Sequence, residues 1–130
     1  MTEPEPVVHA SAIVEDGARL AAGVVVGPCC RVGPEVVLEA GVHLQSHVVV
    51  EGRTTIGART QVHPFVALGG PPQHLRDPGA GTALVIGADC TIREHASIHR
   101  GTALGGGRTV VGDGVLVMCA AHVGHDCAIA

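Results

Sequence analysis

Two histidines and an aspartate stand close together near the end of the sequence. Residues 121–127 read Ala-His-Val-Gly-His-Asp-Cys, so His125 directly precedes Asp126 and follows His122 by three positions. A carboxylate beside an imidazole can fix the tautomer of the ring and stabilise its protonated form. The pattern therefore makes His125 a candidate general base and Asp126 a candidate orienting residue.

The chain contains nine histidines, and most of them need no catalytic role. For five of them we favour a solvated position on an outer face: His9, His43, His47, His63 and His95. A different case is His99, because it opens the segment His-Arg-Gly-Thr at residues 99–102. From the residues alone, residues 121–127 are the place where the sequence points most specifically to chemistry.

The elements that must position these side chains follow a period of six residues. The period is marked by aliphatic side chains, which occupy every sixth position without exception: Val8, Val14, Leu20, Val26, Val32, Leu38, Leu44, Val50, Ile56, Val62 and Leu68. Such a period fits neither an α-helix nor a plain alternating strand, but it fits a short strand followed by a corner. It is typical of a hexapeptide-repeat solenoid, so we expect an all-β parallel β-helix.

The period breaks at about residues 73–85, and we expect an external loop there. Insertions in a solenoid leave the stack of repeats, and such loops often carry function. The marks resume at Ile86, Ile92, Ile98 and Leu104 and, after one extra residue, continue at Val111, Val117, Val123 and Ile129. Three cysteines fall on the small inward phase and are predicted to be buried thiols in a reducing compartment: Cys30, Cys90 and Cys127.

Composition excludes several classes of function. The net charge is −4 and all eight basic residues are arginine, so we expect no nucleic-acid surface. No apolar run approaches about twenty residues, so we expect no membrane span. Residues 1–6 are predicted to be a polar lead-in and residues 7–130 a β-helix domain. Because the period stops in mid-strand without a polar cap, we expect the chain to be truncated.

Several segments together resemble the bacterial UDP-N-acetylglucosamine O-acyltransferases, which catalyse the first step of lipid A biosynthesis. The chain is similar to their N-terminal half, and the similar segments are residues 9–14, 27–28, 32–34, 46–50, 92–94, 98–102, 105–107 and 121–127. The hexapeptide period is common to many acyltransferases. The His-Arg-Gly-Thr and His-x-x-His-Asp segments are far more specific to this family.

The resemblance implies an architecture and a reaction. The expected fold is a left-handed β-helix that forms a cytoplasmic homotrimer, with active sites between adjacent subunits and no cofactor or metal. The expected reaction moves a 3-hydroxyacyl chain from acyl carrier protein to the glucosamine 3-hydroxyl of UDP-N-acetylglucosamine. Further coils and a helical C-terminal region of the family, which include its oxyanion donor, are expected to be missing here.

The resemblance also implies roles for individual residues. His125 matches the family's general base and Asp126 the residue that orients it. Substrate contacts are implied for six further residues: Gln73, His74, Leu75, Arg76, His99 and His122. The insertion departs from the family pattern in three places, because the family usually has an acidic residue at position 74, a lysine at 76 and an aromatic residue at 77, where this chain has His74, Arg76 and Asp77.

Two other functions remain open from the residues alone. The many outer-face histidines are compatible with a zinc-dependent hexapeptide enzyme that resembles the γ-class carbonic anhydrases, in which three histidines surround a metal between subunits. The early stop of the period is compatible with an inactive β-helix fragment.

Overall fold

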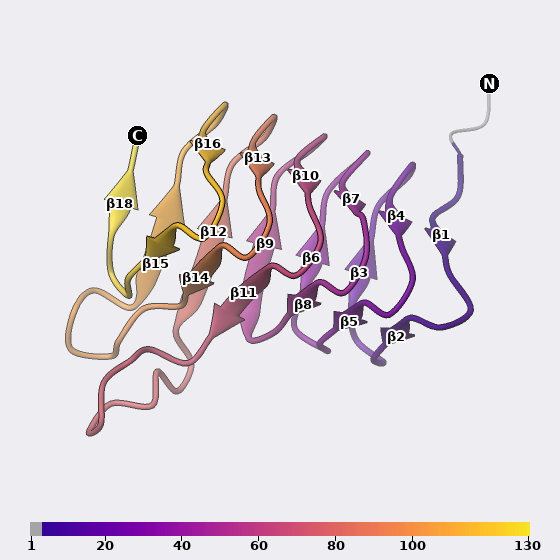
Figure 1. Cartoon of the computed structure of the whole chain (residues 1–130). Helices are drawn as coiled ribbons and strands as arrows, with labels where there is room; N and C mark the ends of the chain where they lie inside the picture. Colours follow the sequence, from indigo (N-terminus) through magenta and orange to yellow (C-terminus); the bar gives the residue numbers. More distant parts are fainter. Residues whose placement is uncertain (1–3) are drawn as a thin grey trace.

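The computed structural model describes residues 4–130, which wind into a parallel β-helix of short strands (Figure 1). Three parallel sheets form the faces of a prism. Sheet A contains β1 (Val7–Val8), β4 (Val25–Val26), β7 (His43–Leu44), β10 (Gln61–Val62), β13 (Thr91–Ile92) and β16 (Leu116–Val117). Sheet B contains β2 (Ile13–Val14), β5 (Arg31–Val32), β8 (Val49–Val50), β11 (Ala67–Gly70), β14 (Ser97–His99) and β17 (His122–Val123). Sheet C contains β3 (Arg19–Leu20), β6 (Val37–Leu38), β9 (Arg53–Ile56), β12 (Ala83–Ile86), β15 (Arg108–Val111) and β18 (Ala128–Ile129).

Each turn of the helix visits the three sheets once, and each strand pairs with the strand one turn later. In the first turns the partners lie 18 residues apart, as Val7 and Val25 do. The backbone amide of Val25 donates to the carbonyl of Val42 at 2.9 Å, and equivalent bonds join the later turns. Three six-residue repeats therefore make one turn, which confirms the expected β-helix architecture.

The aliphatic marks of the six-residue period point into the prism. Every mark from Val26 to Leu68 is at most 1% exposed. The residues four positions beyond the marks also face inward, and those that are fully buried in the middle turns are Val24, Val36, Val42, Val48, Thr54 and Thr60. The two buried threonines donate their hydroxyls to the carbonyls of Glu51 and Gly87. This pairing removes the cost of burying a polar group.

Two loops leave the prism at the same corner, between sheets B and C (Figure 1). The first spans residues 71–82, so the external loop that the sequence placed at about 73–85 begins and ends slightly earlier. Residues 83–85 belong to β12, because they pair with residues 53–55 of β9. The second loop spans residues 100–107. Gln61 pairs with Thr91 and Thr91 with Leu116, so the two affected turns contain 30 and 25 residues instead of 18.

The second loop corrects one prediction from the period. Leu104 was expected to be an inward mark, but its side chain is 89% exposed in the loop at residues 100–107. The core position after Ile98 is occupied by Val111, which is 1% exposed. The chain therefore inserts a whole loop where the spacing of aliphatic residues indicated a single extra residue.

The two ends of the described β-helix are less buried than its middle. Val8 is 42% exposed and Ile129 is 38% exposed. Cys30 and Cys90 are buried as predicted, and burial raises the pKa of the Cys30 thiol. The prediction for Cys127 is wrong, because this thiol is exposed in the last turn, where no further turn of the described chain packs over it.

The polar lead-in that the sequence predicted at residues 1–6 falls partly outside the described residues, since the structure describes the chain from residue 4. Residues 4–6 are exposed and form no strand. Within residues 4–130, no helix has the length and apolar character that crossing a membrane requires.

Candidate functional site at the corner between sheets B and C

Three successive crossings from sheet B to sheet C bring the predicted site residues together. These crossings are residues 71–82 after β11, residues 100–107 after β14 and residues 124–127 after β17. They stack on one another because the strands on either side of each crossing pair with those of the next, with an irregularity of register between Leu68 and Gly70 of β11. Residues more than 50 positions apart in sequence therefore share one corner of the prism.

His125 and Asp126 form a hydrogen-bonded pair at this corner. The Nδ1 atom of His125 lies 3.1 Å from Oδ2 of Asp126, and the two side chains are 32% and 17% exposed. A carboxylate only accepts hydrogen bonds, so Nδ1 carries the hydrogen and Nε2 presents a lone pair. The ring is thus held in the tautomer that can accept a proton at Nε2.

Asp126 has a backbone conformation that suits its residue type. Its φ angle is +65°, in the left-handed region that aspartate and asparagine enter more readily than most residues. Its amide donates to the hydroxyl of Thr109 at 2.9 Å, which fixes the crossing onto β15. The carboxylate is therefore aimed by the corner itself and does not depend on His125 for its position.

Asp126 also binds the second loop. The amide of Thr102 donates to Oδ1 at 2.8 Å and its hydroxyl donates to Oδ2 at 2.5 Å. Gly105 packs so closely that a Cβ there would collide with this carboxylate. Burial by itself raises the pKa of Asp126, but the hydrogen bonds from Thr102 and His125 outweigh burial and hold that pKa below its usual range.

The lowered pKa of Asp126 predicts a pH-dependent contribution to stability. A depressed carboxyl pKa stabilises the fold above the unfolded pKa of about 4, and this contribution is lost as pH falls through the folded-state pKa. We expect Asp126→Asn to melt at a lower temperature than the wild type at neutral pH, with the two melting temperatures converging below about pH 4. Thermal unfolding followed by circular dichroism between pH 7 and acid checks this. The control is Asp16→Asn, because Asp16 is exposed. If the difference in melting temperature between the wild type and Asp126→Asn stayed constant into acid, the expectation would be contradicted.

His99 and His122 form a second pair on the outer face of sheet B. Their ring centroids lie 5.1 Å apart with an interplanar angle of 73°. His99 Nδ1 donates to the carbonyl of Pro71 at 2.7 Å, and His122 Nδ1 lies 3.0 Å from the hydroxyl of Ser97. Both rings are thus oriented by their Nδ1 atoms, and His99 is joined to the start of the first loop.

The first loop brings its own histidine to the dyad. The His74 ring centroid lies 6.1 Å from that of His125, in an edge-to-face arrangement. The other predicted loop residues, Gln73, Leu75 and Arg76, are exposed, and the Leu75 side chain is fully so. The structure therefore brings His74, His125 and Asp126 together at one corner, and it places the His99–His122 pair on the outer face of sheet B. Gln73, Leu75 and Arg76 are exposed to solvent in the same loop as His74.

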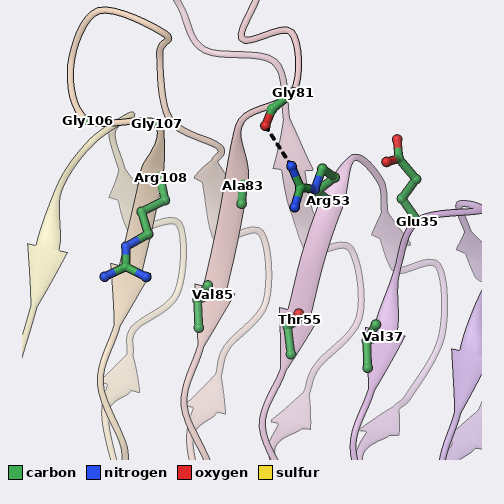
Figure 2. A pocket seen from close by; sticks show the side chains of 10 residues that line it. All are labelled: Glu35, Val37, Arg53, Thr55, Gly81, Ala83, Val85, Gly106, Gly107 and Arg108. Carbon is green, nitrogen blue, oxygen red and sulfur yellow. Dashed lines mark hydrogen bonds between the residues drawn. The ribbon is translucent and has the colours of Figure 1, made fainter.

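A separate hollow lies on the outer face of sheet C (Figure 2). Its volume is about 480 Å³, and it is lined by Glu35, Val37, Arg53, Thr55, Gly81, Ala83, Val85, Gly106, Gly107 and Arg108. Arg53 donates from Nη1 to the carbonyl of Gly81 at 3.0 Å, which ties the end of the first loop to sheet C. None of the predicted site residues lines this hollow. It is therefore distinct from the histidine cluster, which consists of His74, His99, His122 and His125. Within residues 4–130, no group of three or more His, Cys, Asp or Glu side chains is arranged to hold a metal ion.

Comparison with known proteins was made by sequence and by structure. No protein-family model matches the chain. The acyl-(acyl-carrier-protein)–UDP-N-acetylglucosamine O-acyltransferase of Azorhizobium caulinodans is 56% identical over 119 residues, which are 92% of this chain and 44% of that protein. The enzymes of the same name from Mesorhizobium japonicum and Rhizobium johnstonii are 48% and 49% identical, over 92% and 94% of this chain and 43% and 45% of those proteins. Over 92–94% of its length, the chain is similar to UDP-N-acetylglucosamine O-acyltransferases.

Solved structures of the acyltransferase family agree with this similarity. A crystal structure of a UDP-N-acetylglucosamine acyltransferase superposes with a TM-score of 0.92 at 39% identity and covers 94% of this chain and 47% of that one. The Moraxella catarrhalis enzyme gives 0.91 at 37% identity, with 94% and 48% covered. The β-helix is left-handed, as in these enzymes. The chain spans less than half of the length of the curated relatives that it matches.

Three further residues support the site, although sequence reasoning gave them no role. Thr102 binds Asp126 as described above. Arg100 donates from its guanidinium to the carbonyls of Gly69, Pro78 and Gly79, at 2.9, 3.3 and 3.2 Å. Asp77 is only 5% exposed, although the four residues before it are exposed. The sequence did carry a signal for each, because Arg100 and Thr102 belong to the His-Arg-Gly-Thr segment and Asp77 departs from the family pattern.

Proposed function

We propose that the chain supplies the general base and a substrate-contacting face of an acyltransferase that moves a 3-hydroxyacyl chain from acyl carrier protein to the 3-hydroxyl of UDP-N-acetylglucosamine. The observation that carries the proposal is the His125–Asp126 pair, held at 3.1 Å with Nε2 as the proton-accepting nitrogen. The names and the 44–56% identity of the curated relatives support the substrates. This reaction is the first step of lipid A biosynthesis.

In the proposed reaction, the oxygen of the sugar 3-hydroxyl attacks the thioester carbonyl, and His125 Nε2 accepts the proton of this hydroxyl. The new bond is an ester C–O bond, and the bond that breaks is the thioester C–S bond. The proton passes from the imidazolium to the departing thiolate of acyl carrier protein. Asp126 is suited to stabilising the imidazolium between these steps, because a nearby carboxylate favours the charged ring.

Six further residues are proposed to contact the substrates. His99 and His122 present fixed rings on the outer face of sheet B, and His74 lies against His125. Gln73, Leu75 and Arg76 extend from the same loop and are exposed. Arg76 would provide a positive charge for a phosphate, with the planar geometry of guanidinium in place of a point charge.

We further propose that the active protein is a homotrimer with the site between subunits. The histidine cluster lies on an open face, and Leu75 and Leu104 extend beside it at 107% and 89% exposure. Burial of such exposed leucine side chains by a neighbouring subunit removes apolar surface from water and stabilises the association of the subunits. Sedimentation equilibrium of the full natural protein is expected to give three times the subunit mass, and a monomer would contradict this part of the proposal.

The test of the reaction uses the full natural protein that contains this chain. Incubation with 3-hydroxyacyl-acyl carrier protein and UDP-N-acetylglucosamine is expected to release the free carrier thiol and form the 3-O-acylated nucleotide sugar, both followed by mass spectrometry. A nucleotide sugar without the 3-hydroxyl is the matched control and should receive no acyl chain. Equal thioester loss with this control would indicate hydrolysis and overturn the proposal, and so would stoichiometric zinc on which turnover depends.

A further inference from the structure

Asp77 is a buried carboxylate in the first loop, at residues 71–82. The four residues before it, at positions 73–76, are all exposed, whereas Asp77 is 5% exposed. A buried carboxylate needs hydrogen-bond donors to offset the loss of hydration. The hydrogen-bond donors to Asp77 therefore show which parts of the chain its side chain connects.

The two oxygens of Asp77 are bound by two different loops. Oδ1 accepts from the amide of Gly79 at 3.0 Å within its own loop, and Oδ2 accepts from the amide of Leu104 at 3.2 Å in the loop at residues 100–107. The Gly79 amide, followed by those of the second loop, holds the pKa of Asp77 below its usual range. The Leu104 side chain is exposed, so the two loops meet here through polar contacts. A phenylalanine side chain at position 77 would have no acceptor that could make these bonds.

The second loop is in turn bound to the candidate catalytic pair. Thr102 donates two hydrogen bonds to Asp126, and Asp126 contacts His125. The connection closes on itself, because His74, three residues before Asp77, packs its ring against that of His125. Residues 73–76 and the His125–Asp126 pair are therefore joined by the His74–His125 ring contact, and through Asp77 by hydrogen bonds at both ends of residues 102–104.

Arg100 fixes a different part of the first loop. Its guanidinium binds the carbonyl of Gly69 before the loop and those of Pro78 and Gly79 after Asp77. Arg100 is the first residue of the second loop, so these contacts also join the two loops, on the C-terminal side of Asp77. The bond to Leu104 is the link through the Asp77 side chain itself. Loss of the Asp77 carboxylate should thus free segment 73–76 from the second loop, while Arg100 keeps the later part of the first loop in place.

We propose that Asp77 is a positioning residue that ties the substrate-contacting segment 73–76 to the loop that holds Asp126. Its kinetic consequence rests on the function proposed above. A contacting side chain that is held in place before binding loses less conformational entropy when the substrate arrives. The hydrogen bond between Asp77 and Leu104 should therefore affect mainly substrate binding, since Asp126 keeps its own bonds to Thr102 and His125.

The experiment compares Asp77→Ala and Asp77→Asn with the wild type, in the full natural protein. The matched control is Asp113→Ala, because Asp113 also accepts from a backbone amide, that of Ala88 at 2.8 Å, at a different corner. Hydrogen exchange measured by NMR, without substrate, reports on the Gly79 and Leu104 amides. Steady-state kinetics give KM for UDP-N-acetylglucosamine and kcat separately.

Asp77→Ala is expected to raise exchange at both amides at least about tenfold, since each loses its acceptor. It should also raise KM about tenfold, with kcat changed less than about threefold. Asp77→Asn keeps one carbonyl oxygen and should fall between Asp77→Ala and the wild type, whereas Asp113→Ala should leave both amides and KM unchanged. Unchanged hydrogen exchange in Asp77→Ala would contradict the link that Asp77 makes between the two loops. Raised exchange together with a wild-type KM would contradict the positioning role of Asp77. If the wild-type protein shows no acyl transfer, only the proposed function is refuted. The hydrogen-exchange measurement tests the contact between Asp77 and Leu104 without substrate.

Discussion

Replacement of His125 by alanine is expected to lower kcat for acyl transfer about a thousandfold, within the range of a lost general base. The reason is geometric, because Asp126 binds Nδ1 of the His125 ring and leaves Nε2 as the proposed acceptor for the proton of the sugar hydroxyl. KM for UDP-N-acetylglucosamine should change far less, since substrate contacts are proposed for other residues. The measurement is steady-state kinetics of the full natural protein with 3-hydroxyacyl-acyl carrier protein.

The matched control for His125→Ala is His43→Ala. His43 lies in β7 on the outer face of sheet A, away from the corner between sheets B and C, and it is half-buried like His125. Its replacement should leave kcat within about twofold of the wild type. A His125→Ala protein that kept more than about a tenth of wild-type kcat would remove this residue from the general-base role.

Leu44→Ala is expected to lower the free energy of unfolding by about 2–5 kcal/mol, the usual cost of a cavity left by a buried leucine. Leu44 is 0% exposed and lies at the centre of the prism. The measurement is urea unfolding followed by circular dichroism. Because solenoids can unfold in several steps, the comparison uses the midpoint of the transition that includes the central turns.

The control for Leu44→Ala is the same substitution at Leu104. Both leucines fit the aliphatic pattern of the sequence, but Leu104 is 89% exposed in the second loop. Its replacement should change the unfolding free energy by no more than about 0.5 kcal/mol. Equal destabilisation by the two substitutions would contradict the placement of Leu104 outside the core.

Most of the candidate site could be predicted from the sequence, but its supports could not. The histidine and aspartate of residues 121–127 and the His-Arg-Gly-Thr segment were visible as residue types at fixed spacings. The roles of Thr102 and Asp77 were not, because each binds a partner 24 or more residues away. Nothing in the local spacing indicates that these loops would meet.

The sequence by itself determined the parallel β-helix of this chain, because every six-residue repeat makes the same local choice of strand, corner and inward side chain. An aliphatic period of this length leaves few other folds. Tertiary structure alone decided what happens where the period breaks. It placed Leu104 outside the core, and it stacked the two loops and residues 124–127 at one corner. There the carboxylates of Asp77 and Asp126 bind backbone amides and a hydroxyl of the second loop, contacts that only the stacking of successive turns creates.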